Sequence, residues 1–372
     1  MIKYLCFLFL VLLTACTGVI ETLPIADADR YKIQEIAAVK HGGPMDLSAD
    51  GHMVAWSDTG LNLFMVETHQ RRRLLDTTPD AICWSPDGKM LVAVVPQDGD
   101  SHLYVFSQAG QSVYDEKIPG RVSRLQWLEH GSLTAGILDH TTYKFGTHIV
   151  AHLLQWDALW RTTQIPLYET TIKPVTAVQL AGHLHETLDF DISSFGDEVL
   201  YTRLYAPPAF AATRHLVLRH LQTAVESKIA DLPLIDGAGR LTSDGESALI
   251  SNGVDAVRLE EMWNSERLTI WAGDSFSYAP PSGLIVVGNQ LYQGGRSVLR
   301  LPPSSHAQIS FGGDFLLVKW HSQLYLLSGY LVSHDNGPKI VDMEKLLKLR
   351  RLRSRGLIEP DEYHQSRERL LQ

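Results

Sequence analysis

The chain is poor in cysteine, in basic charge and in long apolar runs, and each shortage excludes a class of protein. Three cysteines in 372 residues cannot support a disulfide-rich fold. The 33 basic and 42 acidic side chains give a net charge of −9, which argues against a general nucleic-acid surface. The apolar run over residues 4–13 has about half the twenty or so residues that a membrane-spanning helix needs. The apolar share of 45% and the charged share of 20% are typical of a folded soluble protein.

Familiar catalytic and metal motifs are also missing from the sequence. It contains no Gly-x-Ser-x-Gly elbow, Walker loop, His-Glu-x-x-His or Cys-x-x-Cys pair. In a strand, His183 and His185 would share a face and could present two imidazoles to a metal, with Glu186, Asp189 and Asp191 nearby. No third ligand follows from the spacing, so a polar loop entering a strand is the favoured interpretation. We therefore predict no metal, no cofactor, no catalytic residue and no enzymatic activity.

The beginning of the chain has the pattern of an export signal. Lys3 precedes the short apolar run, and such a run is typical of a signal-peptide core rather than a membrane anchor. The run ends in Leu-Thr-Ala-Cys, residues 13–16, which resembles the lipobox of bacterial lipoproteins. The resemblance implies cleavage after Ala15, transfer of a diacylglyceryl group to the thiol of Cys16, and acylation of the new amine, for example with palmitate. Two or three acyl chains would anchor the protein stably in a membrane.

This resemblance sets the expected location and the first domain boundaries. Residues 1–15 are expected to be the signal peptide and residues 16–30 a lipidated tether. Thr17 follows the cysteine, where an Asp would favour the inner membrane of a Gram-negative cell. The protein is therefore expected in the bacterial cell envelope, on the outer membrane facing the periplasm. Membrane lipid, held through Cys16, is its first expected partner.

A turn signal recurs along the body of the chain, each time before a short apolar run. The turns contain Gly and mostly Asp or Ser, which suit tight hairpins. Successive turn glycines are separated by 37, 43, 65, 49, 38 and 30 residues, near the forty or so of a four-stranded propeller blade. The glycines are at positions 51, 88, 131, 196, 245, 283 and 313.

The second repeat unit, Trp84 followed by Ser-Pro-Asp-Gly-Lys over residues 85–89, resembles the hairpin of WD-repeat-like and TolB-like propellers. We therefore predict an all-β, seven-bladed β-propeller over residues 31–333, with six blades as the alternative because the last two units are short. The 65-residue interval predicts an insertion around residues 168–185 or a distorted blade. Residues 33–39 have no turn motif, and we expect them to form the outer strand of the last blade and close the ring.

Cysteine and tryptophan in the body are assigned mainly to packing. Cys83 lies in an apolar run and is predicted to be a small buried filler. Trp127 and Trp320 are expected to pack between blades. For Trp156 and Trp160, exposure at a partner surface is the alternative to such packing.

The end of the chain changes from strand to helix patterns. Residues 342–355 contain no Gly, Pro or aromatic residue, and Gly356 and Pro360 suit the end of one helix and the start of another. Residues 342–372 are predicted to form an α-helical hairpin and resemble the short C-terminal domain family known as SHOCT, which implies a role in association. The basic residues of its first helix predict a solvated face, with an anionic-lipid contact as the alternative.

Together these patterns favour a lipid-anchored envelope protein whose propeller is a non-catalytic protein-binding scaffold. Its expected partners are an unidentified envelope protein and further copies of itself, aided by the C-terminal helices, and not nucleic acid. One alternative is a propeller enzyme, a metal-dependent lactonase or a sugar-acting type. Another is a structural or assembly lipoprotein of the outer membrane.

Overall fold

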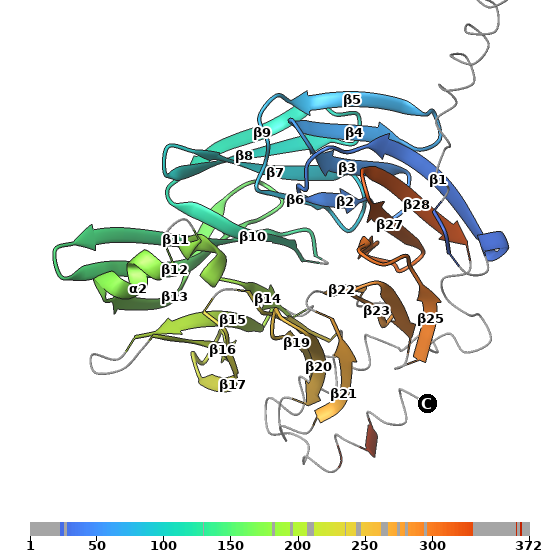
Figure 1. Cartoon of the computed structure of the whole chain (residues 1–372). Coiled ribbons are helices and arrows are strands. Elements are labelled where there is room, and N and C mark those ends of the chain that lie inside the picture. Colours follow the sequence, from blue (N-terminus) through green and yellow to red (C-terminus); the bar gives the residue numbers. More distant parts are fainter. Residues whose placement is uncertain are drawn as a thin grey trace, which may run out of the picture.

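The structure, a computed structural model, describes residues 23–25 and 28–329, together with residues 362, 365 and 366. Within the body it leaves out residues 129, 181–182, 194–195, 207–211, 235, 243–246, 262–266, 274–275, 280–281 and 294–295. The described part forms seven four-stranded antiparallel sheets arranged in a ring (Figure 1). The prediction of a seven-bladed β-propeller is therefore confirmed, and the six-bladed alternative is wrong.

Each blade runs from an inner to an outer strand. Blades 1 to 3 comprise β2 (Met45–Leu47), β3 (Met53–Ser57), β4 (Leu61–Met65) and β5 (Gln70–Leu75); β6 (Ala81–Trp84), β7 (Met90–Gln97), β8 (Asp100–Ser107) and β9 (Ser112–Ile118); and β10 (Arg121–Trp127), β11 (Leu133–Tyr143), β12 (Gly146–Trp156) and β13 (Thr162–Ile172). Blades 4 and 5 comprise β14 (Phe190–Ile192), β15 (Glu198–Tyr205), β16 (Thr213–His220) and β17 (Glu226–Leu232); and β18 (Ala238–Leu241), β19 (Ser247–Ser251), β20 (Ala256–Glu261) and β21 (Arg267–Ala272).

Blade 6 comprises β22 (Phe276–Ala279), β23 (Leu284–Val287), β24 (Gln290–Gln293) and β25 (Arg296–Arg300). Blade 7 comprises β26 (His306–Ile309), β27 (Phe315–Trp320), β28 (Gln323–Gly329) and, from the other end of the chain, β1 (Tyr31–Ala38). The short helices are η1 (Ala28–Arg30), α2 (Pro174–Gln179) and η2 (Leu184–Thr187).

The recurring turn between the first and second strands of a blade is held by its own side chains. In blade 1 the Ser48 hydroxyl donates to Asp50 at 2.5 Å and accepts from the backbone N–H of Met53 at 3.0 Å. Gly51 between them has a φ of 69°, which a side chain at Cβ would disfavour. The same bonds join Ser85 to Asp87 at 2.7 Å and Met90 N–H to Ser85 at 2.9 Å. The repeat seen in the sequence is thus a locally determined turn.

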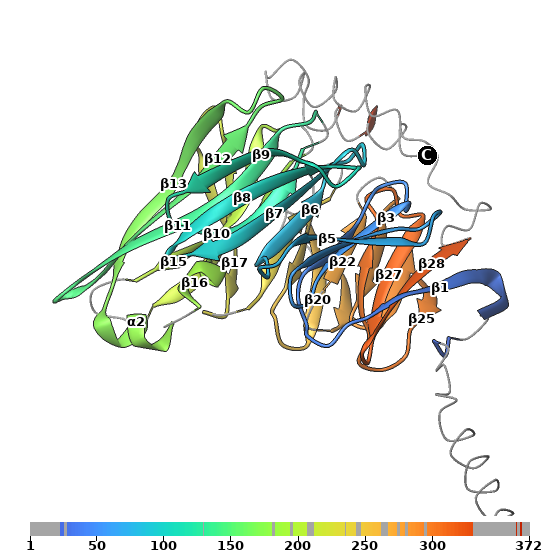
Figure 2. The same cartoon turned by 90° about the horizontal axis from the view of Figure 1, so that it is seen from above.

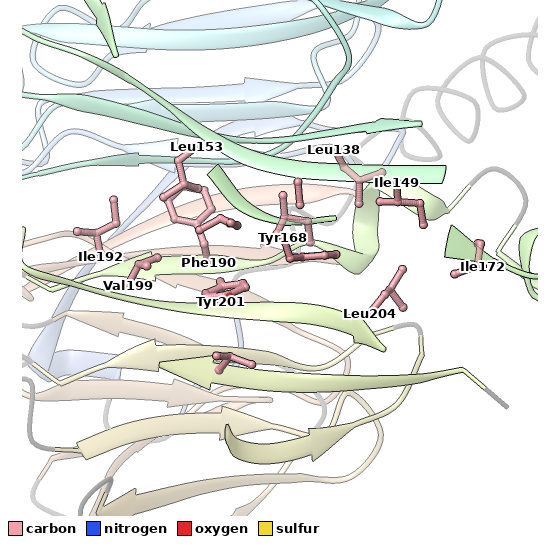
Figure 3. Close-up of a cluster of buried hydrophobic side chains, with 14 of the residues drawn as sticks. Leu138, Ile149, Leu153, Tyr168, Ile172, Phe190, Ile192, Val199, Tyr201 and Leu204 are labelled. Atoms are coloured by element: carbon pink, nitrogen blue, oxygen red, sulfur yellow. The ribbon is translucent and has the colours of Figure 1, made fainter. Parts of the chain in front are cut away.

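The core lies between neighbouring blades, where apolar side chains from two sheets interlock. Figure 3 shows the cluster between blades 3 and 4, in which the rings of Tyr168 and Tyr201 stack with centroids 6.2 Å apart. Phe190 fits because Gly136 of β11 lacks a side chain: a Cβ there would lie 2.8 Å from the Phe190 ring. Burial of both faces of each sheet explains why β4 is buried along nearly its whole length instead of alternating.

Ring closure joins the two ends of the body. β1 pairs antiparallel with β28, with Tyr31 opposite Gly329 and Ala38 opposite Gln323. Ile36 and Ala37 add to a buried cluster at the junction of blades 7 and 1. The prediction that this segment supplies the outer strand of the last blade is confirmed.

Blade 3 accounts for the long interval in the repeat. Its strands β11, β12 and β13 have 11 residues each, and no other described strand exceeds 8. The connection to blade 4 adds α2 and η2, so the extra length comes from long strands as well as from the predicted insertion. The leader, Cys16, most of the tether and most of residues 342–372 lie outside the described residues. Within the described residues of the chain, no helix is long and apolar enough to cross a membrane.

Candidate functional site

The inner strands of all seven blades place a polar or thiol side chain at one equivalent position, and together these side chains line a cavity of about 410 Å³ in the channel. The ring of seven consists of Asp46, Cys83, Gln126, Asp191, Arg240, Ser277 and Gln308. We call this set the channel ring. The cavity also touches residues of the first turn of several blades, such as Pro86 and Phe311. It therefore opens toward the face that carries these turns, which we call the turn face.

Several members of the channel ring bond to the next blade. Asp46 accepts from Trp84 N–H of blade 2 at 2.7 Å, and Asp191 accepts from Leu241 N–H of blade 5 at 2.7 Å. Hydrogen bonds to ring side chains also join neighbouring blades at three further junctions. Ile192 N–H donates to Gln126 at 2.9 Å, Ile309 N–H donates to Ser277 at 3.1 Å, and Gln308 Nε2 donates to Asp46 at 2.9 Å. The last bond joins blade 7 to blade 1. The channel ring thus links sheets that share no strand.

Next to the channel ring, the buried carboxylate of Asp189 pairs with two arginine side chains. Its carboxylate accepts from Arg240 Nη1 at 2.6 Å and lies 3.5 Å from Arg124 Nη1. Burial raises the pKa of Asp189, while the charges of Arg124 and Arg214 oppose that shift. Charge pairing of this kind keeps the channel from carrying an uncompensated buried charge.

Burial changes the proton affinity of three ring members. It raises the pKa of Asp46 and of Asp191 to about 7 each, although backbone hydrogen bonds act in the opposite direction. Burial likewise raises the pKa of the Cys83 thiol to about 12, so this cysteine stays protonated and a poor nucleophile at neutral pH. The prediction that Cys83 is a buried filler needs correction, because its half-buried side chain lines the cavity.

A carboxyl with a raised pKa in the folded state leads to a prediction about pH. Between 3.8 and about 7 the folded chain holds a proton on Asp191 that the unfolded chain has lost, so this group lowers stability as pH rises through that window. Asp191→Asn removes the titration. We expect the free energy of unfolding of the variant to improve relative to the natural chain by about 1 kcal/mol between mildly acidic and neutral pH. Urea denaturation at several pH values measures this difference, and a constant difference would contradict the raised pKa.

A second cavity of about 410 Å³ lies between blades 2 and 3 on the turn face. Three tryptophans, Trp127, Trp156 and Trp160, line this groove together with Pro86 and Met90. Its charged lining residues are neutralised, since Asp87 pairs with Lys89 at 3.1 Å, and Asp157 pairs with Arg161 at 2.6 Å. An aromatic floor with paired charges at the edge is the usual composition of a protein-binding patch.

The loop that carries Trp160 is held in an unusual conformation. Trp160 has a φ of 59°, in the left-handed region that non-glycine residues seldom adopt. Asp157 fixes the loop by accepting from the N–H groups of Leu159 at 2.8 Å and Arg161 at 3.0 Å. These bonds, the Arg161 backbone foremost, lower the pKa of Asp157. The Trp160 ring stacks on Tyr114 with centroids 4.6 Å apart, so the indole is already positioned at the groove.

The tryptophan predictions have mixed outcomes. Trp156 is fully buried and donates to Glu116 at 2.9 Å, so packing is confirmed and an exposed role is wrong for this residue. Trp320 packs against the cluster between blades 6 and 7, as predicted. Trp127 and Trp160 are half-buried, and both line the groove.

The polar segment over residues 183–191 is split by the fold. His183 is the N-cap of the 3₁₀ helix η2 and His185 lies within it, so the alternative in which they share a strand face is wrong for them. His183 Nδ1 lies 3.0 Å from Glu186 at the surface, Asp191 lines the channel cavity, and Asp189 pairs with Arg124 and Arg240. Nowhere in the described part of the chain do three His, Cys, Asp or Glu side chains gather in a way that could hold a metal.

The channel ring is not predicted above, although the sequence contains a signal for it. In most units the ring residue stands two positions before the Ser or Thr that begins the turn, with an apolar residue between them. Asp-Leu-Ser at 46–48, Asp-Ile-Ser at 191–193 and Gln-Ile-Ser at 308–310 all follow this pattern. Most of the inner strands have only three or four residues, which is too few to show a clear alternation of polar and apolar side chains.

Comparisons with known proteins support the fold and no closer relationship. No protein-family model matches the chain, and no curated protein does. Among solved structures, it is similar to a chain in a crystal structure of a mitotic checkpoint complex, with 13% identity, 84% of this chain and 94% of that chain covered, and a TM-score of 0.53. It is also similar to a Dos1 propeller, with 8% identity, 80% and 94% covered, and a TM-score of 0.52.

A third match is the Cps50 (Swd1) propeller domain of Myceliophteria thermophila, with 11% identity, 80% and 99% covered, and a TM-score of 0.47. At these identities the likeness concerns the fold alone. The chain has the fold of a seven-bladed β-propeller.

Proposed function

We propose that this propeller is a non-catalytic protein-binding scaffold that is lipid-anchored in the bacterial envelope and binds its partner on the turn face. The supporting observation is that the groove and the channel cavity adjoin, since Ser85, Pro86 and Trp127 line both. An extended peptide could lie across the blade 2–blade 3 junction, with an apolar side chain among the tryptophans and its polar end at the channel mouth. One structural neighbour is a chain in a mitotic checkpoint complex, which fits a role in assembly.

Trp160 offers a direct test of the groove. Truncating a central aromatic anchor commonly weakens a protein interface by about tenfold or more, so Trp160→Ala is expected to lose the partner. The measurement is recovery of crosslinked envelope proteins with the full chain, quantified by mass spectrometry. Leu159→Ala is the matched control, because Leu159 is 71% exposed and does not line the groove.

A protein recovered with the natural chain and with Leu159→Ala, but not with Trp160→Ala, would support the proposal. Equal recovery with all three would exclude the groove as the binding site. Thermal melting of Trp160→Ala verifies that the propeller is intact, since loss of the stack on Tyr114 removes some packing.

The membrane anchor is a separate part of the proposal and rests on the lipobox-like residues 13–16. Cys16→Ser removes the thiol that would accept the diacylglyceryl group, so we expect the protein to leave the membrane fraction or to be mislocalised. Cys83→Ser is the control, because this thiol lies in the channel, and it should remain membrane-associated. Persistence of Cys16→Ser in the membrane fraction would overturn lipid anchoring and leave the groove proposal unaffected.

A further inference from the structure

The long hairpin of blade 3 carries an unusual apolar tip. β11 and β12 pair as far as Tyr143 opposite Gly146, and the last five residues of β11 are all exposed. At the turn, Phe145 is 84% exposed and Tyr143 is 61% exposed, and Lys144 Nζ lies 5.6 Å from the Phe145 ring. Side chains of this size are normally withdrawn from water, so the tip lacks a covering partner within the described structure.

The helix α2 extends this apolar surface. It packs beside β12 and exposes Val175 and Val178, 64% and 75% accessible. In Figures 1 and 2 the hairpin and α2 project together from the same side of the ring. We call Tyr143, Phe145, Val175 and Val178 the blade 3 tip.

The charged side chains nearest the blade 3 tip in sequence are lysines, and the first acidic residues, Asp139 and Glu169, lie farther along the strands, where Glu169 is 3.9 Å from His148. Residues 140–148 and 170–178 contain no Asp or Glu, although acidic residues outnumber basic ones in the whole chain. Lys144 and Lys173 are both exposed there. Aromatic and aliphatic side chains flanked by lysines are suited to the interface of a bilayer with anionic lipids, where the rings enter the headgroup region and the ammonium groups meet the lipid charge.

The start of the described chain lies on the same face of the ring. Leu23 and Ile25 belong to the buried cluster between blades 6 and 7, which includes Leu299 at the end of β25. In Figure 2 the described start of the chain lies on the side of the ring toward which α2 projects. In an antiparallel blade the fourth strand ends on the face where the second strand ends, which is the face of the β11–β12 turn. Cys16 precedes Leu23 by seven residues, a reach of up to about 25 Å. A lipid on Cys16 and the blade 3 tip could therefore contact one bilayer.

We propose that the blade 3 tip is a peripheral membrane-contact site that inserts into an anionic bilayer interface and orients the ring with its turn face away from the membrane. The groove between blades 2 and 3 would then remain open to a partner. The contact does not depend on that groove, which lies on the opposite face. It does not require the anchor either, because the tip presents its own apolar and cationic groups.

An environment-sensitive fluorophore on Phe145→Cys tests this in the full chain, with Cys6, Cys16 and Cys83 each replaced by serine. Phosphatidylcholine vesicles with phosphatidylglycerol should shift the emission to the blue and brighten it several-fold. The same label on Leu159→Cys, on the turn face, is the matched control and should still report water. Adding Lys144→Ser and Lys173→Ser should weaken binding to anionic vesicles by about fivefold per lysine, and vesicles of phosphatidylcholine alone should bind less well.

Three results would overturn the proposal. The first is an unchanged emission at position 145 with both kinds of vesicle. The second is an equal shift at positions 145 and 159, which would mean that the ring has no preferred orientation. The third is a shift that needs no vesicles and grows with protein concentration, which would assign the tip to a second copy of the chain. Because Phe145 is 84% exposed, its replacement does not disturb the core.

Discussion

Replacing Arg214 by alanine is expected to lower the free energy of unfolding by about 3–5 kcal/mol. Arg214 is 1% exposed, and its guanidinium donates to the carbonyls of Thr187 at 2.9 Å, Gly237 at 3.0 Å and Asp236. Removal takes this donor from the Asp236 and Gly237 carbonyls, leaves Thr187 with only the Thr202 hydroxyl as a side-chain donor, and deprives Asp189 of a compensating charge. Urea denaturation of the purified chain measures the loss.

Arg214→Lys separates charge from geometry in the same experiment. Lysine keeps the positive charge near Asp189 but cannot reach three carbonyls with one planar group, so an intermediate loss is expected. Burial also lowers the pKa of Arg214, and a buried lysine would lose its proton more readily. If Arg214→Ala were as stable as the natural chain, the segment around Thr187 and the connection between blades 4 and 5 would not depend on this side chain.

Removing β1 should open the ring. A chain that begins at Val39 lacks the strand that pairs with β28 and loses Ile36 and Ala37 from the cluster at the junction of blades 7 and 1. Loss of this apolar burial alone predicts a decrease of at least about 3 kcal/mol in unfolding free energy, and the exposed edge of β28 favours aggregation. Differential scanning calorimetry and soluble yield provide the measurements.

A chain that begins at Tyr31 is the matched control, because it lacks Leu23 and Ile25 but keeps β1. A peptide with the sequence of residues 31–38 should restore a cooperative transition to the shorter chain, and the same peptide with Ile36→Asp should not. If the chain from Val39 melted like the control, closure by β1 would not stabilise the ring.

Much of the fold could be predicted because its repeated unit is local. The turn of blade 1 needs only Ser48, Asp50 and Gly51, which lie within four residues and bond to one another. Counting such turns gave seven blades and placed residues 33–39 in the last one. The favoured interpretation of residues 183–191, a polar loop that enters a strand, agrees with η2 followed by β14, whereas the alternative strand through His183 and His185 does not.

The candidate site was much less predictable. The groove is formed by Pro86 from one blade and Trp127, Trp156 and Trp160 from the next, and their proximity follows from how two sheets pack. For Trp156 and Trp160 a partner surface is the alternative to packing between blades, and the sequence cannot show that Trp156 is buried and bonded to Glu116, or that Trp160 is fixed by a left-handed backbone.

By itself the sequence determined the number and kind of sheets, because turn chemistry and strand propensity act over a few residues. Only the tertiary structure decided what the channel contains and which surfaces are open. Gln308 and Asp46, for example, are 262 residues apart and bond only because the ring closes. Likewise, Asp189 obtains its cationic neighbours from three different strands, β10, β16 and β18. Long-range contacts of this kind depend on the angle at which all seven sheets pack, and no short stretch of sequence encodes that angle.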